Sequence, residues 1–371
     1  MNCHCAIKQQ LKKVVRVPAM KRSPTPVSNL AVVEGIFAVD KPPSTSSAQV
    51  IRNLQEKFDP SRLFQPWLRQ EKARLEVARA GQRKRRHRPL HVKMGHGGTL
   101  DPEATGVLIL GVGSGTKLLG SFLNCTKSYE TVVLFGAATD TYDCWGRIVG
   151  QKQYEQITRD RVEDALKQYR GKIMQKPPIY SALHVRGKRL YEYAREGLKV
   201  PIEIQPRPVE VHELEIVDWY EGGSHAWRWP AEREEDAEES AEKKRRRLSS
   251  SVEPNQDKAT GSAETGELET VQSEGNLPKA PSITPCPAPA VRLRMTVSSG
   301  FYVRSLCHDL GQAVDSLACM VSLVRTRQGD FQLGRNVLSY DDLCQDEDIW
   351  GKQVEGMLRA WNEKQQGKAC S

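Results

Sequence analysis

A stretch of 70 residues, 221–290, constrains the fold of this 371-residue chain most, because it is unsuited to a packed core. It carries 14 Asp and Glu against 9 Lys and Arg, and few large apolar residues follow Trp229. Burial of so little apolar surface cannot offset the entropy of ordering the chain. Apolar residues alternate on both sides, over 209–217 and 291–297, which is typical of strands with one buried face. We therefore predict one strand pair joined by a long disordered insertion over 221–290.

A second atypical stretch, residues 59–93, is strongly basic, with 11 Lys and Arg against 3 Asp and Glu. It ends in a dense basic run at 83–88. The whole chain has a net charge of +9. Such a balance favours a polyanionic partner, although a solvated charged surface is the plain alternative. We interpret 59–93 as a basic insertion that contributes to affinity for such a polyanion, with neutral loop growth as the alternative.

Without the two insertions and residues 1–33, 233 residues remain, which suits one domain rather than two. We predict an α+β domain over 34–343, followed by a C-terminal tail at 344–371. Hairpin-like neighbours outnumber strict β-α-β alternation, so the sheet should be mixed, mostly antiparallel and flanked by helices. The expected strands are 35–39, 107–110, 129–135, 209–217 and 291–297, and the expected helices are 46–57, 159–169, 191–196 and 303–317.

The N-terminal extension, residues 1–33, contains six Lys and Arg but no Asp or Glu. This composition makes it a candidate mitochondrial targeting segment, although Pro18 limits any helix and Met20 offers a second start. The basic run at 243–247 is a candidate nuclear import signal. We expect the nucleus and the mitochondrion as compartments, with the cytoplasm open as a third.

Several functional classes find no support in the sequence. No apolar run approaches the roughly 20 residues of a membrane span. The nine cysteines form no C-x-x-C pair, and no His, Cys or Asp cluster has metal-ligand spacing, so we expect neither cofactor nor metal. Residues 111–117, GVGSGTK, resemble a phosphate-binding loop but fit neither the Walker nor the dinucleotide pattern. We predict a tight strand-to-helix turn there.

The most specific motif is residues 95–108, which read GHGGTLDPEATGVL. Its glycines allow close backbone approach to a ligand, and Pro102 stiffens the turn after Asp101. A carboxylate on such a turn can act as nucleophile or base, whereas a lone Asp-Pro is more often a turn or a helix cap. The whole string resembles the motif of the TruB family of pseudouridine synthases, enzymes that modify the T-loop uridine of tRNA, position 55.

Further motifs resemble the same family and occur in its order. They are DKPPSTSS at 40–47, KSY at 127–129, GAATDTYD at 136–143, PPIYSAL at 177–183, GKRLYEYAR at 187–195 and SGFYVRSL at 299–306. One departure is Ser44, where a glycine is usual. A second is the short segment after residue 343, from which we expect no C-terminal RNA-binding PUA domain. The resemblance implies a pseudouridine synthase fold with a central RNA-binding cleft.

The resemblance also implies roles for individual residues. Asp101 becomes the catalytic carboxylate for cleavage of the uridine C1′–N1 bond, either by covalent attack on C1′ or by assistance through a glycal-type intermediate, before the base rejoins through C5. Tyr129 is expected to stack on the flipped base, although a half-buried strand aromatic is the alternative. Arg304 is expected to pair with Asp101 and keep it ionised, and Asp143 to orient Arg304. Leu323 would supply an apolar wall, with core packing as the equal alternative.

RNA-binding roles are implied for the residues around the catalytic carboxylate. His96 is expected to lie against the T loop and to fill the space that the flipped base leaves. Gly97, Gly98 and Thr99 share its loop and are expected to contact RNA. Lys41 and Lys117 are expected to contact the RNA backbone.

The implied function is isomerisation of uridine to pseudouridine in the T loop of tRNA, and T-loop-like mRNA sites stay open. We expect a monomer without an obligate protein partner. Two alternatives are a guide-dependent synthase of the dyskerin type and a tRNA-folding chaperone. The chaperone would need the cleft but not the carboxylate.

Overall fold

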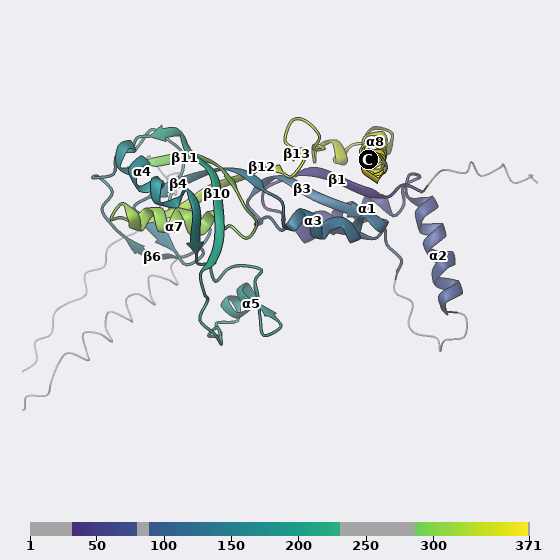
Figure 1. Ribbon diagram of the computed structural model, residues 1–371, viewed down its shortest axis with the longest axis horizontal. Coiled ribbons are helices and arrows are strands. Elements are labelled where there is room, and N and C mark those ends of the chain that lie inside the picture. The colour runs from purple at the N-terminus through teal and green to yellow at the C-terminus, as the bar shows by residue number, and fades with distance from the viewer. Residues whose placement is uncertain (1–31, 80–88, 231–285, 370–371) are drawn as a thin grey trace, which may run out of the picture.

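The computed structural model describes residues 32–79, 89–230 and 286–369, and a mixed β-sheet runs through its whole length (Figure 1). The sheet has nine strands in the order β1-β3-β12-β4-β11-β10-β7, with β2 beside β3 and β13 beside β12. Its strands are β1 (Gly35–Lys41), β2 (Met94–His96), β3 (Thr105–Val112), β4 (Lys127–Phe135), β7 (Gly171–Gln175), β10 (Arg207–Tyr220), β11 (Ala290–Val297), β12 (Ala318–Gln328) and β13 (Phe331–Gln332). Two short hairpins add β5 (Ala137–Thr139) with β6 (Ile148–Gln151), and β8 (His184–Val185) with β9 (Lys188–Arg189).

The pairing of β3 with β12 is parallel, while the other described pairs of this sheet are antiparallel. The predicted α+β fold with a mixed, mostly antiparallel sheet is therefore confirmed. The parallel pair is formed by the second and third strands of this order and places Arg325 opposite Gly106. The pairing of β3 with β12 joins the two halves of the sheet next to the motif at 95–108.

Helices cover the sheet in two groups (Figure 1). Near β4, β10 and β11 lie α4 (Arg159–Leu166), the 3₁₀ turn η2 (Lys167–Tyr169) and α7 (Val303–Ala313). Near β1 and β3 lie α1 (Ser47–Phe58), η1 (Gly113–Leu118), α3 (Leu119–Leu123), η3 (Asp342–Cys344) and α8 (Glu347–Ala369). The helix α2 (Gln65–Arg79) projects from this end of the molecule, and a lobe with α5 (Leu190–Arg195) projects from the other half on the same side (Figure 1).

The apolar patterns account for these elements. Leu306 and Leu310 lie one turn apart on α7 and are fully buried against the strands. Ser46 caps α1 by accepting a hydrogen bond from the Gln49 backbone, as an N-cap serine should. The predicted helix 303–317 ends earlier, at Ala313, because Asp315 adopts a positive φ of 56° that no helix continues through. The predicted turn after β3 is confirmed, since η1 and α3 follow it directly.

Parts of the insertions and of the tail belong to the folded body. In the stretch predicted as a basic insertion, Phe64 stacks on Phe58 at 4.5 Å, and Trp67 and Val92 are buried in the same core cluster. The stretch predicted as a tail is mostly α8, whose Trp350 stacks on Phe58 at 5.1 Å.

The described ends of the acidic stretch also pack. Trp229 donates a hydrogen bond to the Phe135 carbonyl at 2.8 Å, and Cys286 is buried. The predicted disorder concerns mainly residues 231–285, which lie outside the described residues, as do the candidate targeting segments. No described helix is long and apolar enough to span a membrane.

Candidate active site

The loop that carries Asp101 joins β2 to β3, and its backbone needs glycine at two positions. Gly98 has a φ of +133° and Gly106 a φ of +100°, a region that favours glycine. A Cβ on Gly106 would lie 2.3 Å from the Arg325 carbonyl oxygen across the parallel pair. Gly98 and Gly106 therefore allow close packing of this loop on β12.

Arg325 holds the loop from inside the protein. Its side chain is 1% exposed and donates to three backbone carbonyls, those of Val107 at 2.8 Å, Gly98 at 3.2 Å and Thr99 at 3.4 Å. Gln328 adds a bond to the Gly97 carbonyl at 2.5 Å. Neither Arg325 nor Gln328 was predicted from the sequence. Both are polar residues on a strand that is otherwise largely apolar, and such residues are equally typical of the solvent-facing side of a strand.

Lys41 was expected to contact the RNA backbone, and this prediction is wrong. Its side chain is fully buried, and its Nζ donates to the carbonyls of Pro42, Thr45 and Pro102 at 2.6–2.7 Å. Burial lowers its pKa to about 8, which the nearby Glu103 and Asp101 carboxylates oppose. With all three donors used, Lys41 fastens the start of α1 to the Asp101 loop.

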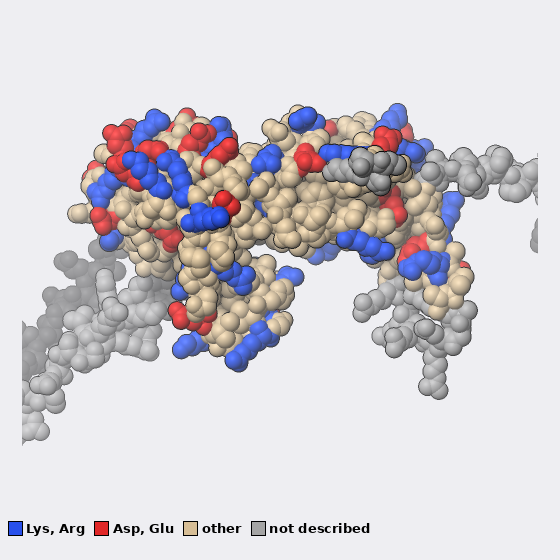
Figure 2. Space-filling model, in the orientation of Figure 1, with Lys and Arg blue, Asp and Glu red and all other residues tan. Residues whose placement is uncertain are grey.

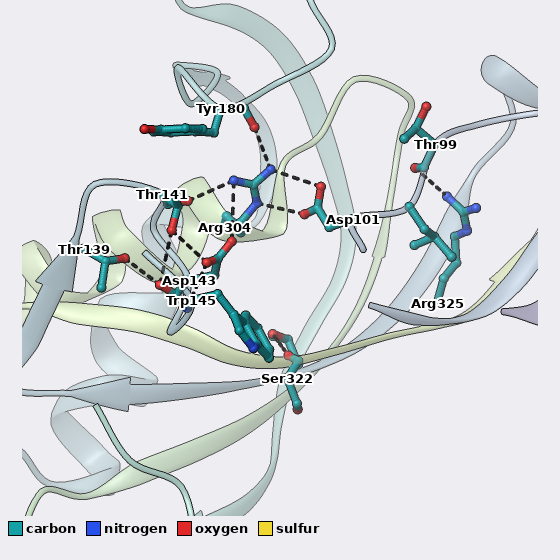
Figure 3. Close-up of polar contacts among 12 residues, drawn as sticks. Thr99, Asp101, Thr139, Thr141, Asp143, Trp145, Tyr180, Arg304, Ser322 and Arg325 are labelled. Atoms are coloured by element: carbon teal, nitrogen blue, oxygen red, sulfur yellow. Dashed lines mark hydrogen bonds and ion pairs between the residues drawn. The ribbon is translucent and has the colours of Figure 1, made fainter. Parts of the chain in front are cut away.

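Arg304 at the start of α7 makes a bidentate ion pair with Asp101 (Figure 3). Its Nε lies 2.8 Å from Oδ2 of Asp101, and a terminal nitrogen lies 3.1 Å from Oδ1. The remaining donors bind the carbonyls of Thr141 at 2.9 Å and Tyr180 at 2.8 Å. The arginine side chain is 8% exposed and that of Asp101 36%, so the carboxylate is fixed in orientation while one side stays open.

Asp143 completes the charged chain that the sequence predicts. One of its oxygens lies 3.7 Å from Arg304, and it accepts hydrogen bonds from the Thr141 hydroxyl at 2.7 Å and the Trp145 backbone at 3.2 Å. Burial raises the pKa of Asp143, whereas Arg304 and the hydrogen bond from Thr141 lower it. The guanidinium thus lies between two carboxylates from distant parts of the chain.

Tyr129 on β4 and Leu323 on β12 lie on adjacent antiparallel strands and are buried in one core cluster with Leu100, the residue before Asp101. This placement suits an apolar wall beside the carboxylate and also suits plain core packing. Their predicted roles at the base therefore stay predictions.

His96 lies half-buried at the end of β2, and its Nδ1 has no hydrogen-bond partner in the described part of the chain. Burial lowers its pKa, and the positive charges of Arg325 and Arg189 lower it further, so the ring is neutral near pH 7. Thr99 is exposed in the same loop, and Lys117 is exposed on η1. Among the described residues, no group of three or more His, Cys, Asp or Glu could hold a metal ion.

Comparisons with known proteins bear on this arrangement. Residues 84–229 match the N-terminal domain of the TruB family pseudouridylate synthases. The chain is 38% identical over 330 residues to tRNA pseudouridine synthase 4 of Schizosaccharomyces pombe, covering 81% of this chain and 79% of that protein. It is 31% identical over 350 residues to tRNA pseudouridine synthase 4 of Saccharomyces cerevisiae, covering 88% and 85%. A solved Cbf5–Nop10–Gar1 complex contains a chain with 18% identity and a TM-score of 0.47, covering 87% of this chain and 59% of that one.

The two fungal relatives define the class to which this fold and site belong, the pseudouridine synthases. Within that class, the chain belongs to the TruB family, as its motifs predict.

Proposed function

We propose that this protein isomerises uridine to pseudouridine in tRNA. The observation that carries the proposal is the Asp101 carboxylate, which Arg304 holds in a bidentate pair on a glycine-rich loop while leaving it partly open. The names of the fungal relatives support tRNA as the substrate. They do not favour a guide-dependent synthase.

The arrangement suits cleavage of a glycosidic bond. A fixed carboxylate can assist departure of the base from C1′, and the bidentate pair with Arg304 holds both of its oxygens in place. The apolar side chains of Tyr129 and Leu323 can keep the detached uracil in a dry site while it turns to present C5. A folding chaperone would need none of this carboxylate geometry.

We extend the proposal to the T-loop uridine at position 55 and to T-loop-like sites in mRNA, acted on by a monomer. The family motifs support the first of these extensions. We also propose nuclear and mitochondrial forms, on the composition of residues 1–33 and 243–247. Pseudouridine mapping in total RNA from cells lacking the protein tests the RNA targets, and fractionation of tagged protein tests the compartments.

The central test is Asp101→Asn, assayed for pseudouridine on an unmodified tRNA transcript. We expect turnover to fall to background while tRNA affinity stays within about threefold, because the amide preserves shape but not charge. Asp164→Asn is the matched control, since Asp164 is an exposed surface aspartate of α4. Turnover by Asp101→Asn at the level of this control would reject the assignment.

A further inference from the structure

A cavity of about 770 Å³ lies beside the active site. Its lining includes the rings of Tyr142 and Tyr180, whereas Asp101 and Arg304 do not line it. The carbonyl of Tyr180 accepts a hydrogen bond from Arg304, and the ring of Tyr180 points away from Asp101 (Figure 3). The Arg304 guanidinium therefore separates the catalytic carboxylate from this cavity.

Asp309 on α7 lines the cavity and has no partner. It is half-buried, accepts no hydrogen bond and forms no ion pair within the described ranges 32–79, 89–230 and 286–369. Burial raises the pKa of Asp309 to about 6, so the carboxyl group is mostly ionised near pH 7. A half-buried carboxylate without a donor is energetically costly, and such a group calls for an explanation. A donor from a bound molecule would satisfy it.

The same cavity contains two lysines, Lys176 and Lys199, both exposed at its edge. Neither forms an ion pair with another described residue, Asp309 included. The ring of Tyr142 stacks on His308 at 3.9 Å with an interplanar angle of 10°, which presents a flat aromatic wall. The cavity thus offers a hydrogen-bond acceptor, two free cations and aromatic surface.

A nucleotide has the complementary groups. Its base can donate a hydrogen bond to the carboxylate and is a flat ring that can stack, and its phosphate can pair with the lysines. We propose that this cavity binds the nucleotide next to the target uridine in the same RNA strand, with Asp309 accepting a hydrogen bond from the amino group of its base. Adenine, cytosine and guanine carry an exocyclic amino group, whereas uracil has carbonyl oxygens in its place and only its ring N3–H as a donor. A carboxylate aligned with the amino group should therefore select against uracil. The lysines would contact phosphate and the tyrosine rings would stack on the base. This inference rests on the proposed function, because it requires RNA bound at Asp101.

The test measures kcat/KM for pseudouridine formation on T-arm hairpin RNAs. Each nucleotide flanking the target is changed in turn to uridine or made abasic. The proteins are wild type, Asp309→Asn, Lys199→Gln and the control Asp315→Asn. Asp315 follows α7, its side chain is 84% exposed and pairs with Arg161, and it lies outside the cavity. Asparagine also tolerates the positive φ of this position.

We expect Asp309→Asn to lower kcat/KM about tenfold on the unchanged hairpin. At one flanking position, uridine or an abasic site should lower the wild-type value by a similar factor and should add no further loss in Asp309→Asn. Lys199→Gln should weaken binding more at low salt than at high salt. Since Lys199 is exposed, this variant keeps the test valid if Asp309→Asn folds poorly.

Three results would overturn the inference. Asp309→Asn could behave like Asp315→Asn on every hairpin, or it could lose activity equally whatever the flanking base, which would indicate a structural role. Alternatively, free CMP or AMP could inhibit wild type but not Asp309→Asn, with no dependence on the flanking base, which would make this a free-nucleotide site. Failure of the wild-type protein to form pseudouridine on the unchanged hairpin and on tRNA would instead reject the proposed function.

Discussion

Replacement of Arg325 tests whether this buried arginine places the catalytic loop. In Arg325→Met, the carbonyls of Gly98, Thr99 and Val107 lose their charged donor inside the protein. A hydrogen bond to a charged group contributes about 1.5–3 kcal/mol, and the bond to Thr99 is long at 3.4 Å, so about two such contributions are lost. We therefore expect the free energy of unfolding to fall by about 3–6 kcal/mol.

Activity should fall as well, because the loop carries Asp101. A shift of about 1 Å in a reacting group can cost about 100-fold in rate, so we expect kcat to drop by about that factor while KM changes less than about threefold. Arg325→Lys should recover part of the rate, since it keeps the charge but cannot span three carbonyls. Urea unfolding and steady-state kinetics under conditions where all variants are folded measure the two effects separately.

The matched control is Arg327→Met, two residues along the same strand. Arg327 donates to Ser128, Thr126 and the Gly329 carbonyl, and it makes none of the bonds to the Asp101 loop. Its replacement should leave kcat within about threefold. A wild-type kcat in Arg325→Met, together with a free energy of unfolding within about 1 kcal/mol of wild type, would refute the role of Arg325 in placing the loop.

Three further predictions follow from other contacts. Asp143→Asn and Arg304→Lys should each lower the single-turnover rate. The double variant should lose less than the sum of the two single losses in activation free energy, because the two residues share one ion-pair chain. Strict additivity of the two losses would contradict that chain. Gly106→Ala should lower the free energy of unfolding by about 2–4 kcal/mol in urea titrations, since the new Cβ meets the Arg325 carbonyl, and near-wild-type stability would count against this packing. Deletion of 81–88, which spares the buried Phe64, should weaken tRNA binding and flatten its salt dependence. Unchanged affinity at two salt concentrations would refute an RNA-binding role.

The sequence was sufficient for the parts of the fold that local patterns specify. Alternating apolar residues predicted β10 and β11, and the structure pairs them directly across the acidic stretch. The glycine-rich motif located the Asp101 loop, and the order of motifs predicted that Arg304 and Asp143 would meet there. These successes depend on short-range periodicity or on a family resemblance that already contains the long-range geometry.

Two of the errors, at Lys41 and Arg325, have a common physical cause, because burial of a charged side chain depends on contacts far away in sequence. The sequence around Lys41 is the same whether its ammonium group binds a phosphate or, as here, three backbone carbonyls. Arg325 lies more than 200 residues from the loop that it holds. The helix α8 was taken for a tail although Trp350, Val354 and Leu358 recur at helical spacing, so that signal was present and unused.

Three buried cations, Lys41, Arg304 and Arg325, surround the Asp101 loop and bind different groups, and this difference bears on catalysis. Lys41 and Arg325 bind loop carbonyls and leave the carboxylate oxygens free, although Lys41 is near enough to interact electrostatically with Asp101. Arg304 is the one of the three that binds those oxygens. Positive charge therefore surrounds the Asp101 loop on several sides, while the open side of Asp101 stays available to a sugar. It follows that Arg304→Lys should act directly at the carboxylate by removing its bidentate partner, whereas Arg325→Lys should act through the position of the loop that carries the carboxylate.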